Sequence, residues 1–190
     1  MALATAYDTV GSKVRARVQN ASCNCATRDK IPFQSINRSG SYNYDARLQR
    51  HHLLPKQLLS KKYFNRLFDC IGRACVGFDD FRFNGLLLPG TELASIQTGL
   101  PLHRGPHPIY NDMVIERIGS IESRWDLVRG KDPRTARTEA LERMRLLQRA
   151  LRIRLINERK NLVLNRKDPL GTGFDFDELD AMAEKLWSST

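Results

Sequence analysis

The chain has 190 residues, 41% of them hydrophobic, and its 31 Lys and Arg outnumber its 21 Asp and Glu, which gives a formal net charge of +10. This hydrophobic fraction is enough for a core and excludes wholesale disorder, and the length fits one ordinary domain with extensions or one domain plus a small helical one. The excess positive charge raises the local concentration of polyanions, so nucleic acid is a candidate partner.

No hydrophobic run approaches the roughly 18–20 residues that span a bilayer. The start of the chain is too short, and too soon interrupted by Asp8, for a Sec-type signal peptide. We therefore expect cytoplasmic synthesis and, if the protein is exported, a route that needs no cleavable signal.

The first 45 residues show little regular pattern. Residues 1–22 carry a weak helical pattern, and residues 22–46 are rich in Ser, Asn, Gly and Asp, which predicts a loop. The basic and aromatic side chains of this loop either contact phosphates and bases or pack across the domain surface. They are Arg28, Lys30, Phe33, Arg38, Tyr42 and Tyr44.

Two short strands are predicted in the middle of the chain. Residues 46–54 form a strand-like run, and residues 86–88 form a buried strand that Pro89-Gly90 ends. The Asn84-Gly85 step before the second strand favours a tight turn with positive φ.

Helical spacing of apolar residues recurs along the rest of the chain. Pro55 opens the first helix, Gly130 fits a helix C-terminus, and Asp132-Pro133 fits an N-cap followed by a first-turn proline. The predicted helices span about residues 55–69, 91–98, 107–129, 134–159 and, after an Asp175 cap, 176–187. Residues 72–80 and 99–106 are predicted as loops, and residues 161–165 as a short strand.

One face of the predicted helix 134–159 is rich in arginine. Such a face is either solvated or contacts phosphates. Its members are Arg134, Arg137, Arg145, Arg149, Arg152 and Arg159.

The four cysteines, Cys23, Cys25, Cys70 and Cys75, have C-x-C and C-x4-C spacings. These fit poorly to the C-x2-C knuckles of zinc sites, so we expect free thiols. A structural zinc site and a disulfide are the alternatives, and a reducing compartment disfavours the disulfide.

All four histidines fall in two short clusters, His51-His52 at the end of a predicted strand and His103 with His107 around a helix start. Imidazole is the commonest metal ligand and the usual general base near neutral pH. Adjacent residues of a regular strand point to opposite sides, so one member of the first pair can face a metal and the other a substrate water. The second pair spans a loop–helix junction, and both of its rings can converge on one ion.

Hydrolysis of a phosphodiester needs a base for the attacking water and a positive charge to neutralise the phosphate and the leaving oxygen. One histidine and one metal ion supply both. Three ligands, His51, His103 and His107, would leave positions on the ion for water and phosphate.

Three segments, in this order, closely resemble the AHH nucleases of the HNH/endonuclease VII (ββα-metal) superfamily, many of which are toxin domains of bacterial polymorphic toxin systems. They are Arg50-His51-His52-Leu53-Leu54-Pro55, Asn84-Gly85-Leu86-Leu87-Leu88-Pro89 and His103-Arg104-Gly105-Pro106-His107-Pro108-Ile109-Tyr110-Asn111. The resemblance covers about residues 46–128, and the chain has Arg50 where the family name calls for Ala.

The resemblance implies a β-hairpin and a following helix that grip one divalent ion, either Mg²⁺, Mn²⁺, Ni²⁺ or Zn²⁺. Carried over position by position, it makes His52 the general base and places the other three histidines on the metal side. Asn84 would hold the loop or orient the base, and Tyr110 would support the site or touch phosphate. Three basic residues that flank the histidines are expected to contact the nucleic acid, namely Arg50, Lys56 and Arg104.

We therefore expect an α+β, mainly helical fold, in which a small ββα-metal hairpin–helix core has added helices at both sides. The domain prediction is a loop-rich extension over 1–45, a nuclease core over 46–130 and a helical extension over 131–190. The insertion between the two strands is expected to form a helical excursion. The C-terminal extension would bind DNA, dimerise or dock another protein.

The predicted function is that of a metal-dependent endonuclease, with DNA preferred to RNA as the expected substrate. The resemblance to the superfamily implies 5′-phosphate and 3′-hydroxyl ends as the products. The alternative is a module that binds nucleic acid, holds zinc through the histidines and does no chemistry. A role as a bacterial toxin or effector, with a dedicated immunity protein as partner, is compatible with the nuclease prediction.

Overall fold

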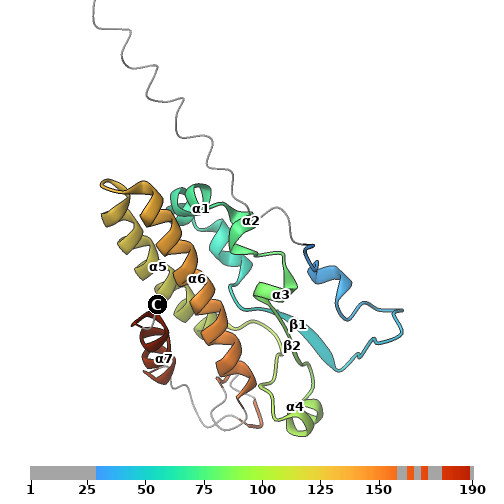
Figure 1. Ribbon diagram of the computed structural model, residues 1–190. Coiled ribbons are helices and arrows are strands. Elements are labelled where there is room, and N and C mark those ends of the chain that lie inside the picture. The colour runs from blue at the N-terminus through green and yellow to red at the C-terminus, as the bar shows by residue number, and fades with distance from the viewer. Residues whose placement is uncertain (1–28, 158–161, 165–167, 171–176, 189–190) are drawn as a thin grey trace, which may run out of the picture.

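The computed structural model describes residues 29–157, 162–164, 168–170 and 177–188 (Figure 1). Within them, β1 (Leu48–His52) and β2 (Gly85–Pro89) form a two-stranded antiparallel sheet. The other regular elements are helical, so the predicted α+β, mainly helical fold is confirmed. The weak helix predicted within 1–22, the Asp175 cap and the last residues of the arginine-rich helix lie outside the described residues.

Both predicted strands form, and their pairing sets the register of the two adjacent histidines. His51 lies opposite Leu86, and His52 lies opposite Gly85. Pro89, which has no N–H to donate, is the last residue of β2, as expected for a proline at a strand end.

The prediction of a tight turn with positive φ at Asn84-Gly85 is wrong. Asn84 ends a helical turn, α3 (Phe81–Asn84), whose N-cap Asp80 accepts a hydrogen bond from Arg82 N. Gly85 has an extended backbone, with φ −108° and ψ 151°. A Cβ at this position would collide with the Phe81 ring, so glycine is required here by close packing and not by positive φ.

The excursion between the strands is helical, as predicted, but its first helix starts later than expected. Pro55 and Lys61 are both extended, with ψ of 141° and 108°, and they confine the chain between them to 3₁₀ turns. The apolar stripe is nevertheless buried at Leu58, Phe64 and Leu67. The elements of the excursion are η3 (Lys56–Ser60), η4 (Lys62–Phe64), α1 (Asn65–Ile71) and α2 (Arg73–Val76), followed by α3.

In the described residues after β2 there are four helices, and each helix predicted for this part of the chain is present. They are α4 (Glu92–Thr98), α5 (Pro108–Arg129), α6 (Pro133–Ile156) and α7 (Asp177–Ser188). Asp132 caps α6 by accepting hydrogen bonds from two backbone amides, as its position before Pro133 predicts. Helix α6 ends at Ile156. Of the strand predicted over 161–165, the structure describes residues 162–164, which are buried but have no regular secondary structure.

One hydrophobic core joins these elements. Helices α5 and α6 pack side by side, α7 lies against α6, and α6 also contacts α1, α2 and α3 of the excursion (Figure 1). The core is therefore continuous across residue 130, from the excursion to the far end of α6. Its largest fully buried side chains include Leu53, Leu54, Leu58, Phe64, Phe68, Ile71, Leu88, Tyr110, Ile118 and Met144.

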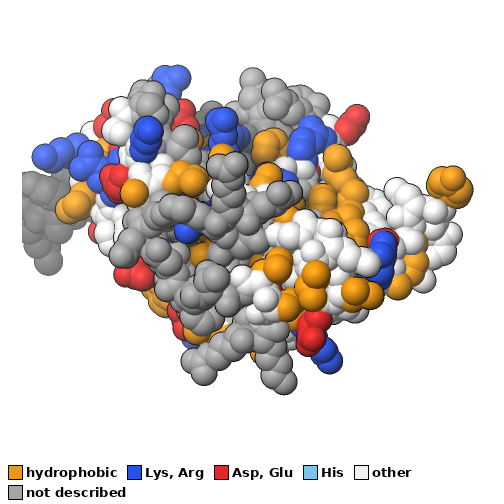
Figure 2. All heavy atoms as spheres, turned by 90° about the horizontal axis from the view of Figure 1, so that it is seen from below, with side chains coloured by type: hydrophobic (Ala, Val, Ile, Leu, Met, Phe, Trp, Pro, Cys, Tyr) orange, Lys and Arg blue, Asp and Glu red, His pale blue; other side chains and the backbone are white. Residues whose placement is uncertain are grey.

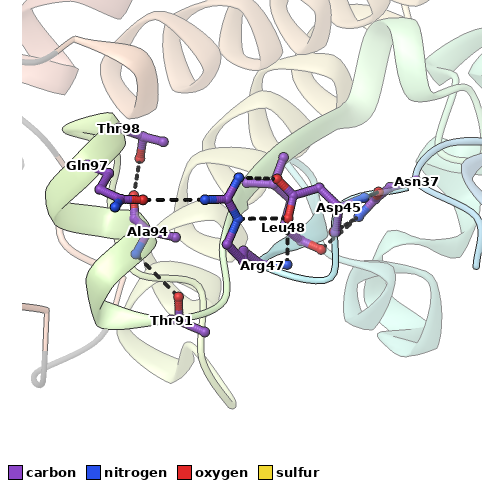
Figure 3. A network of polar contacts seen from close by, with 8 residues as sticks. All are labelled: Asn37, Asp45, Arg47, Leu48, Thr91, Ala94, Gln97 and Thr98. Carbon is purple, nitrogen blue, oxygen red and sulfur yellow. Dashed lines mark hydrogen bonds and ion pairs between the residues drawn. The ribbon is translucent and has the colours of Figure 1, made fainter. Parts of the chain in front are cut away.

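A polar network fixes the chain just before β1 (Figure 3). Asn37 Nδ2 donates to the carbonyls of Asp45 and Leu48, and Asn37 Oδ1 accepts from Asp45 N, at 2.8–2.9 Å. Arg47 forms an ion pair with Asp45 at 2.8 Å and reaches Gln97 of α4 at 3.4 Å. These contacts tie the start of β1 to the preceding loop and to α4.

Of the described helices, none is long and apolar enough to cross a membrane.

Two glycine substitutions should change stability in opposite directions. Gly85→Ala forces the Phe81 ring to move and should lower the free energy of unfolding by about 1–3 kcal/mol. Gly119→Ala, in the interior of α5 with no atom within 4 Å of the added Cβ, should raise it by about 0.5–1 kcal/mol. Urea unfolding of both variants would measure this, and equal effects would contradict the packing role of Gly85.

Candidate active site

Three histidines from three separate segments converge in the fold. His51 lies on β1, His103 in the loop after α4, and His107 immediately before α5 as its N-cap residue. Each offers a ring nitrogen, and these nitrogens all lie within 4.8 Å of one another. The ring centroids are 5.0 Å apart for His51 and His103, 5.8 Å for His51 and His107, and 4.5 Å for the two later histidines. One divalent ion can bridge nitrogens at this spacing.

The elements that hold these rings follow from the local sequence. Gln49 and His51 are two residues apart on β1, so they share a face of the strand. Gln49 Oε1 lies 3.1 Å from His103 Nδ1, and His103 N donates to the carbonyl of Pro89 in β2 at 2.7 Å. His103 is thus held by both strands, at its ring and at its backbone.

The free ring nitrogens fit a metal. His51 Nε2 and His107 Nδ1 are buried and have no hydrogen-bond partner. With its proton on Nδ1, the His103 ring donates to Gln49 and keeps a lone pair on Nε2. Buried polar atoms without partners are uncommon and cost about 1–3 kcal/mol each. A divalent ion that accepts these lone pairs would account for the unpartnered atoms of His51 and His107, but not for His52 Nε2, which is also buried without a partner on the other side of β1.

Burial also sets the protonation state of this cluster. It lowers the pKa of His51 well below the usual range, and the nearby charges of His103 and His107 lower it further. Burial lowers the pKa of His103 to about 4, again with help from His107. Burial lowers the pKa of His107 too, against a hydrogen bond with the Leu164 backbone. All three rings are therefore neutral at pH 7, the form that binds a metal.

His52 lies on the opposite side of β1 from this cluster, as strand alternation predicts. Its ring stacks on that of Phe33, with centroids 3.7 Å apart and planes within 1°. Burial, then the positive charges of Lys56 and Arg50, lower the pKa of His52 to about 4, and Asp79 opposes the shift. The ring is thus neutral at pH 7 and can accept a proton.

Asn84 and Tyr110 are buried and hydrogen-bonded to the residues that follow His52. The Asn84 side chain has no exposed surface; it accepts from Leu54 N at 2.7 Å and donates to the carbonyls of Leu54 and Phe78. Tyr110 is 1% exposed, donates its hydroxyl to the carbonyl of Leu53 at 2.7 Å and packs its ring against His51. Burial raises the pKa of Tyr110, so its hydroxyl stays protonated. Both residues hold the end of β1, and neither reaches the surface.

The three basic residues expected to contact nucleic acid are exposed around the site. Arg50 donates to the carbonyl of Phe33 at 2.9 Å, and Lys56 pairs with Asp79 at 3.3 Å. Arg104 follows His103 in the exposed part of its loop. Their places are compatible with contacts to phosphates on either side of the histidines.

Sequence reasoning missed several residues that shape the site. Gln49 precedes His51 by two residues on a predicted strand, and this spacing indicates that the two side chains share a face of the strand. The sequence places Phe33 among the aromatic residues of the predicted loop 22–46 and does not indicate its contact with His52. Gln148, whose Nε2 donates to Asn84 Oδ1 at 3.2 Å, and Asp168, which binds the His103 loop, are distant in the sequence and carry no local signal.

The cysteine prediction is corrected in part. Cys70 is an exposed free thiol, as expected, but Cys75 is in a disulfide. A disulfide sulfur is not a thiolate, so this structure does not hold a zinc site that uses all four cysteines. Cys23 and Cys25 lie outside the described residues.

An antiparallel strand pair, a helix start and four histidines brought together are what the resemblance to the ββα-metal superfamily implies. A family model describing a nuclease family of the HNH/ENDO VII superfamily with conserved AHH matches residues 33–151, more than half of the chain. The chain belongs to this AHH nuclease family, which confirms the prediction from its histidine pattern. Searches of curated proteins and of solved structures found no match.

The metal-free protein should lose stability as the pH falls from 7 to 5. The folded histidines have lowered pKa values, about 4 for His52 and His103, against about 6.5 in the unfolded chain. Below pH 6.5 the unfolded chain therefore binds more protons, and stability falls with pH until the folded pKa is reached. We expect Tm to drop by at least about 5 °C, measured by circular dichroism in EDTA.

Two features make this measurement specific. Asp45, whose pKa the Arg47 side chain lowers to about 2, titrates outside the window. His103→Asn, which cannot protonate there, should show a smaller drop than the wild type. A Tm that is the same at pH 5 and pH 7 would contradict the burial of the histidines.

Proposed function

We propose that this nuclease is a metal-dependent endonuclease that hydrolyses phosphodiester bonds of DNA. One observation carries the proposal: three imidazoles have ring nitrogens within 4.8 Å of one another, and one of them, His51, stands on β1 beside His52, which faces the other way. His51, His103 and His107 would hold the ion, and His52 would be the general base. This is the division of roles that phosphodiester hydrolysis requires.

The bound ion would neutralise charge on the phosphate and lower the pKa of water near it. The rest of the reaction falls to side chains of this chain. His52, neutral at pH 7, would take a proton from the attacking water, whose oxygen bonds to phosphorus as the P–O3′ bond breaks, and the departing O3′ would take up a proton from solvent. The products are a 5′-phosphate and a 3′-hydroxyl. Three basic residues would bind the neighbouring phosphates. Lys56 would do so as a point charge, and Arg50 and Arg104 through bidentate hydrogen bonds of their guanidinium groups.

One face of the molecule carries charges of both signs (Figure 2). On the face drawn in Figure 2, the Lys and Arg side chains of the described residues are dispersed among acidic and hydrophobic ones. The net charge of +10 would speed the approach of DNA from a distance. The basic residues beside the histidines would then fix the position of the protein on the phosphate backbone of the DNA.

We further propose that the nuclease acts as a bacterial toxin or effector that is restrained by an immunity protein. The support is the family, because many AHH nucleases are toxin domains.

His52→Ala should abolish cleavage without abolishing metal binding. We expect purified wild-type protein to nick and linearise plasmid DNA with at least one of Mg²⁺, Mn²⁺, Ni²⁺ or Zn²⁺, and to lose this activity in EDTA. His52→Ala should lower the rate by about 10²–10⁴-fold, the usual contribution of a general base. Gel assays would measure the rates, and calorimetry would check that the variant still binds the ion.

Several results would separate the proposal from its alternatives. An equally active His52→Ala protein would refute the assigned base. A wild type that binds zinc and DNA, unfolds on chelation and cleaves nothing would identify a non-catalytic zinc module. Poor transformation by a wild-type expression plasmid, restored by His52→Ala, would support the toxin role, and equal transformation by both plasmids would argue against it.

The Phe33 ring should set the acidic limit of activity. Phe33→Ala uncovers one face of His52, so the pKa of this base should rise from about 4 towards 6.5. Because the protonated ring is no base, kcat/KM of the variant should fall at a higher pH, with the midpoint of the acidic limb raised by about one unit or more. Phe33→Tyr, which keeps the stacked ring, is the matched control. Overlapping pH profiles of wild type and Phe33→Ala would show that the stack does not tune the base.

A further inference from the structure

Asp168 is a buried carboxylate that contacts the loop carrying His103. Its side chain lies 66 residues from this loop in the sequence and is only 8% exposed. Oδ2 accepts a hydrogen bond from Leu102 N at 2.8 Å, and Oδ1 accepts one from Leu170 N at 3.0 Å. A carboxylate is rarely buried unless hydrogen bonds satisfy its oxygens, and here both oxygens are used.

The bond to Leu102 bears directly on the position of the His103 ring. Leu102 is fully buried and immediately precedes His103, in a loop without regular secondary structure. Leu102 N is held by Asp168, and the next amide, His103 N, is held by the carbonyl of Pro89 at 2.7 Å. Two consecutive anchored amides fix the backbone from which the ring projects, and Gln49 then fixes the ring itself.

The same part of the chain contacts a second histidine of the cluster. The Leu164 backbone acts on the His107 side chain and raises its pKa against the effect of burial, and Leu162, Val163 and Leu164 are all buried. Residues 162–164 and 168–170 follow α6 and lie beyond residue 151, where the match to the nuclease family ends. The loop of one clustered histidine, His103, is therefore held from outside the matched region, and a second, His107, has part of that region as its neighbour.

We propose that Asp168 is a positioning residue for the metal site, and that residues 162–164 and 168–170 complete the nuclease centre from outside the matched region. The inference rests on the metal role proposed for the three histidines. Asp168 touches neither ion nor substrate. It fixes the backbone at Leu102 so that His103 can bind the ion together with His51 and His107. Outer contacts of this kind commonly change metal affinity by about 10–100-fold.

Zinc titration of the full-length protein by calorimetry tests this proposal. In Asp168→Ala, the dissociation constant for Zn²⁺ should rise about tenfold or more. Asp168→Asn keeps one acceptor oxygen and should show a smaller rise. The visible absorption bands of bound Co²⁺, which report the geometry of the ligands, should change in Asp168→Ala.

Asp132→Ala is the matched control, because Asp132 also accepts from two backbone amides, Arg134 N and Thr135 N, but these belong to the start of α6 and not to the His103 loop. Both alanine variants should lower Tm, whereas only Asp168→Ala should weaken zinc binding. Wild-type affinity in Asp168→Ala would overturn the inference; if that variant does not fold, wild-type affinity in Asp168→Asn would do so. Zinc binding that is unchanged in His103→Ala would instead overturn the proposed metal role, and this inference with it.

Discussion

The geometry of the histidine site depends on one buried side-chain amide, that of Asn84. Its four hydrogen bonds join the chain just after β1, the excursion and helix α6. An amide presents a donor and an acceptor together, so it can satisfy both Leu54 N and the Leu54 carbonyl, which an ionised carboxylate cannot do. Its backbone carbonyl also accepts from Leu53 N. The excursion can thus be long without loosening the strand end that carries the two adjacent histidines.

Strand alternation then divides the chemistry between two environments. Gln49 and His51 face the metal-side cluster, whereas Arg50 and His52 face Phe33 and the surface. A slip of one residue in the pairing of β1 and β2 would exchange these faces and would put the base among the ligands. The fixed register is therefore a requirement of the proposed mechanism, and Asn84 at the end of the excursion helps to set it.

The sequence alone predicted the parts that depend on local pattern. Strands, capped helices and the histidine pattern follow from spacing, and the AHH family was identified from these residues. The turn at Asn84-Gly85 was predicted wrongly because contact with the Phe81 ring, and not backbone conformation, selects Gly85. The first helix was placed too early because Lys61 is extended. The contacts of Gln148 and Asp168 join residues more than 60 positions apart in the sequence, and no periodic pattern of residues predicts such contacts.

Arg50 shows how a departure from the AHH pattern can be accommodated without disturbing the ligands. Because it lies two residues before His52 on a strand, its side chain is on the side of the base and away from the metal-side cluster. Its guanidinium donates to the carbonyl of Phe33, the residue stacked on His52, and its charge helps to lower the pKa of that histidine. An alanine there could do neither. In this chain, the position therefore couples the placement of the stacked ring and the protonation of His52, and in the proposed mechanism also the attraction of a phosphate.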